Sequence, residues 1–297
     1  MKKTFSLIIC LIISLVVLLN IDKFSDYIAN FLDVNRTYAI QSPNNYYKDY
    51  DFMFVQESEE FVPYSYQDLL NIIFSTLNNG WETFTFYCPD EYENCLKDMT
   101  SISKDTTLLS NINNYVHPYN NYSKIGFVTN TSGEVTINVT KLYSDEDIEK
   151  INRGVDEVIT DNITTDLSDD DKLLIIHDYI INNTRYDVDK SNDASFTALG
   201  PLFNGTAVCS GYADLMAIFL NKFGIKNFKV ASDTHVWNAL YINGEWLNLD
   251  LTWDDPITKD SDVDTLQHDF FLVKTEKLLE FDINDHKFDT TIYQELN

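Results

Sequence analysis

The segment from residue 235 to residue 251, HVWNALYINGEWLNLDL, constrains the fold more than any other part of the chain. Two alternating apolar and polar runs flank Asn243-Gly244, a dipeptide that favours the two-residue turn of a tight β-hairpin. If these two residues form the turn, Trp237 faces Asp250 across the two strands. The segment therefore predicts an antiparallel sheet whose register is set by its own residues.

This register also predicts which side chains share a face of the hairpin. Because side chains alternate along a strand, His235 and Asp250 fall on one face as diagonal neighbours, roughly 7–8 Å apart at the backbone. The opposite face carries valine, leucine and isoleucine, which would hold the register by burial. A carboxylate at this position can bond one imidazole nitrogen, fix the tautomer and stabilise the imidazolium.

Cys209 lies where the loop NGTAV gives way to a helix that begins near Ser210 and ends at Gly224. The unpaired N–H groups and positive potential of a helix N-terminus favour a thiolate, and the Cys209 N–H could also bind an oxyanion. Taken singly, a cysteine is more often a small buried apolar residue, and a histidine or aspartate in a hairpin is more often structural. Their order and local context together predict a triad of Cys209, His235 and Asp250.

Several motifs resemble one known family. GTAVCSGYADLMAIFLNKFGI resembles the nucleophile segment of bacterial transglutaminase-like proteins, and THVWNALYINGEWLNLDLTWDDP resembles their histidine and aspartate segments. LLIIHDYIINNTRYD resembles the helix that precedes the cysteine, and HDFFLVKTEKL the strand that follows the triad. The resemblance covers roughly residues 165–280. It is carried by several motifs in a fixed order.

The resemblance implies an α+β fold with a papain-like, transglutaminase-like core, in which the nucleophile helix packs on an antiparallel sheet. It implies Cys209 as nucleophile, His235 as general base and acid, and Asp250 as the orienting group. Such a triad forms a thioester from an amide. Attack by water on that thioester would make the chain a peptidase or amidase, and attack by an amine a transglutaminase. The alternative that we weigh is a surface binding module that uses the same cleft without turnover.

The N-terminus predicts export. Lys2 and Lys3 precede an apolar run that ends at Ile21, which favours an uncleaved membrane anchor with the rest of the chain outside, a cleaved signal being the alternative. The expected organisation is an anchor over 1–21, an extracytoplasmic tether over 22–60, a small α+β region over 61–165 and a transglutaminase-like catalytic domain over 166–297.

The charge balance bears on possible partners. With 47 acidic against 21 basic residues, the formal net charge is −26, which argues against binding to nucleic acid. An enzyme anchored on the outer face would meet cell-wall peptides and surface proteins, so we expect its substrate among them. No cofactor and no metal are expected, since a cysteine triad supplies its own nucleophile.

Four cysteines are too few for a disulfide scaffold in a chain of 297 residues. Cys10 falls in the anchor, and Cys88 and Cys95 lie close enough to bridge a turn, which leaves Cys209 as the odd thiol.

Three of the four histidines outside the triad, His177, His268 and His286, have no partners at metal-ligand spacing, and we interpret them as structural. Trp237, Trp246 and Trp253 fit the wall of a cleft and the packing of a core equally well.

Overall fold

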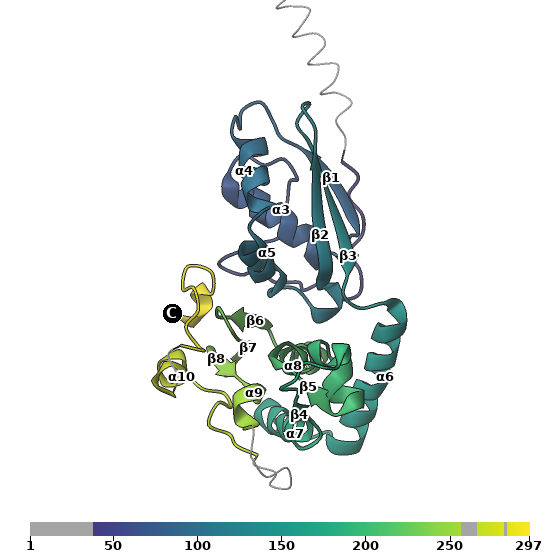
Figure 1. Cartoon of the computed structure of the whole chain (residues 1–297), viewed down its shortest axis with the longest axis vertical. Coiled ribbons are helices and arrows are strands. Elements are labelled where there is room, and N and C mark those ends of the chain that lie inside the picture. Colours follow the sequence, from purple (N-terminus) through teal and green to yellow (C-terminus); the bar gives the residue numbers. More distant parts are fainter. Residues whose placement is uncertain (1–37, 257–265, 282–283) are drawn as a thin grey trace, which may run out of the picture. The chain divides into compact units, whose positions relative to one another are not determined.

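A computed structural model describes residues 38–256, 266–281 and 284–297. The chain divides after Ile40, and nearly all described residues belong to the unit Gln41–Asn297 (Figure 1). The anchor predicted over residues 1–21 lies outside the described residues. Among the helices of the described ranges, none combines the length and the apolar character that a bilayer span requires.

Helices and short strands are interspersed along the described residues. The helices are α3 (Tyr66–Asn78), α4 (Cys95–Ile102), α5 (Thr106–Asn113), α6 (Asp145–Asn162), α7 (Asp169–Asn182), α8 (Cys209–Lys222), α9 (Leu251–Asp254) and α10 (Thr275–Phe281). The strands are β1 (Thr83–Tyr87), β2 (Tyr122–Thr129), β3 (Glu134–Lys141), β4 (Arg185–Tyr186), β5 (Thr206–Ala207), β6 (Asn227–Ala231), β7 (Val236–Ile242) and β8 (Glu245–Leu249). The mixed α+β class predicted from the sequence is confirmed.

The upstream region contains an antiparallel sheet in the order β1-β3-β2, together with α3, α4 and α5. Helix α3 ends shortly before Gly80, whose φ of 71° is a left-handed conformation that glycine adopts without strain. Strands β2 and β3 form an antiparallel hairpin. Cys88 and Cys95 form a disulfide between the end of β1 and the start of α4.

Residues 41–60 differ from the extended tether that their polar composition suggests. Phe52 and Val55 are buried, and the Phe52 ring packs 5.6 Å from that of Phe228 on β6. Lys48 is also buried, and its Nζ donates to the main-chain oxygen of Asn227 at 2.8 Å. The scattered aromatic residues of this segment therefore pack on the compact unit, because the apolar area that they bury outweighs the polar residues between them.

The downstream region is built on the sheet β6-β7-β8. The predicted hairpin register is confirmed, since Ile242 pairs with Glu245 and Leu240 with Leu247. The turn residues Asn243 and Gly244 have φ values of 55° and 87°, as the type I′ turn requires. Helix α8 packs against β7 and β6, and its apolar side chains form one core with those of α6, α7 and the hairpin.

Helix α8 is also fixed by one buried polar group, Asp214. Its carboxylate accepts from Lys229 Nζ on β6 at 2.6 Å and from the Tyr143 hydroxyl at 2.7 Å. Asn121 donates to the same carboxylate from the upstream region. Because each partner comes from a different element, a shift of α8 along its axis would leave a buried charge unpaired, at a cost of about 3–5 kcal/mol.

One element implied by the family resemblance is different. The segment HDFFLVKTEKL does not form a strand beside the triad. It makes an isolated antiparallel bridge between Val273 and Asn248, and then enters α10. Residues 267–272 are held instead by bonds to the α9 segment, such as that from the Gln267 N–H to the main-chain oxygen of Asp254.

Candidate active site

Cys209 is the first residue of α8, as the sequence predicts, and is a half-buried free thiol. The preceding residue, Val208, has no side-chain acceptor, so the N–H groups of the first turn keep their partial positive charge. Gly211 is required in this turn, because a Cβ at this position would lie 2.4 Å from the main-chain oxygen of Ser195. The helix can therefore start close to the neighbouring loop, with Cys209 at its end.

His235 and Asp250 lie at the open end of the predicted hairpin. His235 immediately precedes β7, where its N–H bonds the Ser232 hydroxyl at 3.0 Å, and Asp250 immediately follows β8. The His235 Nε2 lies 2.6 Å from Asp250 Oδ2, and both side chains are buried. A carboxylate only accepts, so Nε2 carries the hydrogen.

The thiol completes this arrangement from the other side of the ring. The Cys209 thiol lies near the His235 ring, and its interaction with the imidazole raises the pKa of His235. Because Nε2 faces Asp250, the second ring nitrogen, Nδ1, is the one left for the sulfur. The structure thus brings together all three residues of the predicted triad, from the start of α8, the residue before β7 and the residue after β8. Their catalytic role stays a prediction.

Asp250 differs in one respect from the strand residue that the sequence suggests. It is the N-cap of the short helix α9, and its Oδ1 accepts from the N–H groups of Thr252 and Trp253 at 3.0 and 3.3 Å. These bonds use one carboxylate oxygen to fix the side chain and leave Oδ2 for His235. The carboxylate is therefore oriented by its own backbone turn.

A second histidine reaches the same oxygen and was missed in the sequence. His286 is fully buried, and its Nε2 lies 3.0 Å from Asp250 Oδ2. Its ring stacks on Phe270 and packs edge-on against Trp237. His286 follows Asp250 by 36 residues with no periodic pattern between them, so the sequence offers no local signal for this contact.

The electrostatics follow from these contacts. Burial alone lowers the pKa of His235, but the charge of Asp250 and the bonds to Asp250 and Cys209 outweigh burial and raise the pKa to about 10. Burial likewise raises the pKa of Asp250, and the two histidines reverse this and hold it at about 2. An imidazolium beside a carboxylate is thus the stable form of the His235–Asp250 pair at neutral pH.

The three tryptophans are distinguished by their contacts. Trp237 is a structural residue of the core. Its side chain is buried, its Nε1 donates to Asn248 Oδ1 at 2.9 Å, and its ring stacks on that of His235. Trp246 packs on Phe228. Trp253 contacts the His286 ring with a centroid distance of 4.9 Å and stays partly exposed beside the triad.

Two further family-like positions support the triad without touching it. Asn238 Nδ2 on β7 donates to the main-chain oxygen of Ala213 at 3.0 Å, which ties the histidine strand to α8. The Tyr212 hydroxyl on α8 donates to Asp255. Asp254, which precedes Asp255, is fully buried and bonded to His177.

Tyr186 on β4 interacts electrostatically with Cys209. Burial raises the pKa of Tyr186, and the charges of Cys209 and Asp285 raise it further. Its hydroxyl therefore stays protonated at neutral pH and can donate a hydrogen bond near the thiol.

Comparison with known proteins agrees with this geometry. Residues 153–251 match the family model of the transglutaminase-like superfamily. This segment of the chain is similar to a transglutaminase-like core. This confirms the resemblance seen in the sequence, and the matched range includes Cys209, His235 and Asp250. No curated protein matches the chain.

Two solved structures are similar to parts of the transglutaminase-like chain. One is described as a TGase, with 14% sequence identity and a TM-score of 0.35, and the match covers 50% of this chain and 48% of that one. The other is a candidate cysteine protease from Cytophaga hutchinsonii, with 17% identity and a TM-score of 0.29, covering 43% of this chain and 61% of that one. The chain thus spans less than two thirds of either neighbour.

Proposed function

We propose that this chain is a cysteine enzyme that acts on amide bonds through a thioester on Cys209. One observation carries the proposal: at the N-terminus of α8, the thiol of Cys209 lies near the buried His235 ring, whose Nε2 is bonded to the carboxylate of Asp250. A structural cysteine would need neither a charged imidazole nor a helix terminus beside it.

The first half of the reaction forms the thioester. The Cys209 sulfur attacks the amide carbonyl carbon, and the developing oxyanion is stabilised by the Cys209 N–H at the start of α8. His235 then gives its Nδ1 proton to the amide nitrogen, the C–N bond breaks and the amine leaves. Asp250 keeps the ring oriented and stabilises its charge in the resting state.

The second half releases the acyl group. His235 Nδ1 takes a proton from water or from an acceptor amine, which attacks the thioester carbonyl carbon. The C–S bond breaks, and the thiolate of Cys209 returns beside the imidazolium. Water as the acceptor makes the enzyme a peptidase or amidase, and an amine makes it a transglutaminase.

The proposed location is the outer surface of the cell, with the membrane as a partner through the N-terminal segment. Lys2, Lys3 and the apolar run to Ile21 support export, and the Cys88–Cys95 disulfide is typical of an oxidising compartment. Cell-wall peptides or surface proteins are then the proposed substrates.

The test is to incubate the full-length chain with wall peptides and a labelled primary amine, and to identify the products by mass. A product that contains the amine would identify a transglutaminase, and a cleaved or deamidated peptide a hydrolase. Cys209→Ala is the control and should yield neither. A wild-type chain that binds the peptides but never forms a thioester adduct would support the alternative, a non-catalytic binding module.

A further inference from the structure

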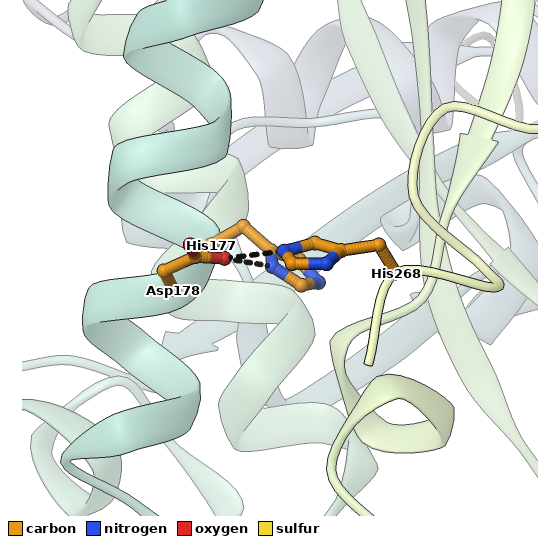
Figure 2. Close-up of side chains that lie close together, drawn as sticks. All are labelled: His177, Asp178 and His268. Atoms are coloured by element: carbon orange, nitrogen blue, oxygen red, sulfur yellow. Dashed lines mark hydrogen bonds and ion pairs between the residues drawn. The ribbon is translucent and has the colours of Figure 1, made fainter. Parts of the chain in front are cut away.

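A second group of side chains converges outside the triad, between α7 and the segment that follows α9. His177 and Asp178 come from α7, and His268 comes from that later segment (Figure 2). Asp178 Oδ1 lies 3.0 Å from His177 Nδ1 and 2.8 Å from His268 Nε2. One oxygen and two imidazole nitrogens from distant parts of the chain thus meet at one point.

The hydrogen bonds of His177 cannot all be satisfied by a neutral ring. Its Nδ1 faces Asp178 and its Nε2 faces Asp254 Oδ2 at 3.0 Å, so both nitrogens point at carboxylate oxygens. A neutral imidazole carries a single N–H, and a carboxylate only accepts. One of the two contacts therefore needs a further proton, on the ring or on a carboxyl group, or a metal ion between the two lone pairs.

We propose that His177 Nδ1, Asp178 Oδ1 and His268 Nε2 bind a divalent transition metal of the zinc class. Two imidazole nitrogens and a carboxylate oxygen are ligands that zinc accepts, in a tetrahedral site with a fourth position open. Two imidazoles on one tetrahedral ion would have ring centres about 5 Å apart. The centres of the His177 and His268 rings are 5.2 Å apart.

The ligand atoms are close to the spacing that such an ion needs. Bond lengths of about 2.0–2.1 Å place neighbouring ligand atoms of a tetrahedral zinc roughly 3.3 Å apart. The contacts of 3.0 and 2.8 Å would therefore open by a few tenths of an ångström. Asp178 and His268 are partly exposed, with side-chain exposures of 31% and 43%, so they can make this movement and admit the ion.

Asp254 supplies the support that a zinc-bound histidine needs. Its Oδ2 accepts from His177 Nε2, which leaves the lone pair of Nδ1 free for the metal. Asp254 is fully buried, and its Oδ1 is held by the Phe270 N–H at 2.9 Å. The carboxylate, the imidazole and the ion would form the carboxylate–histidine–metal arrangement that fixes the ring.

The proposed ion would join α7 to the segment that packs over the active site. Asp254 is the last residue of α9, and its N–H bonds the main-chain oxygen of Asp250. Phe270, two residues after His268 in the chain, stacks on His286. The metal would therefore stabilise the elements that hold Asp250 and take no part in the acyl transfer itself.

The test uses the full-length chain with a histidine-free purification tag and Cys209→Ala, so that the catalytic thiol cannot bind metal. Zinc added after dialysis against a chelator should bind in a ratio of one per chain by calorimetry. Cobalt should give a visible absorption band that zinc displaces. Calcium and magnesium should compete weakly, because they prefer oxygen ligands.

Two ligand variants and two control variants decide whether the cluster is the site. His268→Ala should lower zinc affinity at least tenfold and abolish the cobalt band, whereas Asp269→Ala, its exposed neighbour, should leave both unchanged. His235→Ala, added to the same background, should also keep binding, which excludes the cluster around Asp250. Asp178→Asn provides a second ligand variant with an unchanged shape, should His268→Ala alter the circular dichroism spectrum. Absence of one-to-one binding, or binding that survives both ligand variants, would overturn the proposal.

Discussion

Among the residues that the structure describes, one aspartate oxygen lies between two imidazoles in two clusters, and these clusters differ in their surroundings. In the first, His235, Asp250 and His286 have side-chain exposures of 6%, 1% and 0%. In the second, His177 is equally buried, but Asp178 and His268 are 31% and 43% exposed. Two histidines and one aspartate thus form a buried set and a partly exposed set. We call the buried set (His235, Asp250 and His286) the dry cluster and the partly exposed set (His177, Asp178 and His268) the open cluster.

Burial and the presence of a thiol give the two clusters different chemistry. In the dry cluster both carboxylate oxygens of Asp250 accept hydrogen bonds from the protein, and Cys209 lies near the His235 ring. The opposite charges of His235 and Asp250 therefore stay on these two buried side chains, where they can serve acid–base catalysis. In the open cluster a lone pair of His177 faces a carboxylate, and solvent offers an entry path, which favours an ion.

The largest effect should come from Cys209→Ala. The variant removes the nucleophile from the dry cluster, and we expect turnover to fall by at least ~10³-fold. Only a small half-buried side chain is lost, so the melting temperature should change little. Turnover measured with the substrate found in the amine assay checks this prediction. Retained turnover in Cys209→Ala would show that Cys209 is not the nucleophile.

Asp250→Asn should come next, with turnover lower by roughly 10²–10⁴-fold. The amide keeps the size of the carboxylate but loses its charge, and one end of it presents N–H groups to imidazoles that already donate. Since Asp250 is buried and hydrogen-bonded through both oxygens, we also expect a loss of about 1–3 kcal/mol in the free energy of unfolding. Denaturant unfolding and turnover measure the two effects, and an unchanged value of both would contradict the assignment.

His286→Phe separates positioning from packing. Phenylalanine can keep the contacts with Phe270 and Trp237 but donates nothing to Asp250, so we expect a loss of about tenfold in turnover. The pKa of Asp250 should rise from about 2 toward its usual value, which moves the acid limb of the activity profile to higher pH. His286→Gln restores a donor and should return the limb. A residue that only packs would leave the limb in place.

The pH dependence of stability should also carry the signature of the dry cluster. The pKa of His235 is raised to about 10, so its contribution is complete below about pH 6.5 and is lost as the pH rises through about 10. The pKa of Asp250 is lowered to about 2, so its contribution is complete above about pH 4 and is lost as the pH falls toward 2. The difference in the free energy of unfolding between wild type and Asp250→Asn should therefore decrease toward about pH 2 and toward about pH 10. Denaturant titrations across this pH range measure it.

The smallest effect should come from the central carboxylate of the open cluster. With a chelator present, Asp178→Asn should change the free energy of unfolding by less than about 1 kcal/mol, because exposed charge pairs contribute little. The contrast with Asp250→Asn measures what burial adds to the same arrangement. Equal losses in the two variants would remove the distinction between the clusters.

The parts of the site that the sequence predicts are those encoded locally. The type I′ turn at Asn243-Gly244 fixes the register, and the register brings His235 to Asp250. The place of Cys209 at the start of α8 follows from apolar spacing and the stop at Gly224.

The contacts that the sequence does not predict are long-range. His286 reaches Asp250 across 36 residues, and His268 reaches Asp178 across 90, in both cases from segments without a strand or helix pattern at the contact. The packing of residues 41–60 is missed for the same reason, because Phe52 and Val55 bury apolar area without any periodicity. Spacing rules describe neighbours within one helix or hairpin, and they do not apply to contacts between segments that are far apart in the sequence.

The central claim is that His235 supports a reactive thiolate on Cys209, and alkylation tests it without knowledge of the substrate. Iodoacetamide labelling of the full-length chain is followed between pH 6 and 9 by the mass of the peptide that contains Cys209, with glutathione as the free-thiol standard. We predict a nearly constant rate in the wild type, and in His235→Gln a rate that rises about tenfold per pH unit, as for an ordinary thiol. The same profile in both proteins would contradict the account.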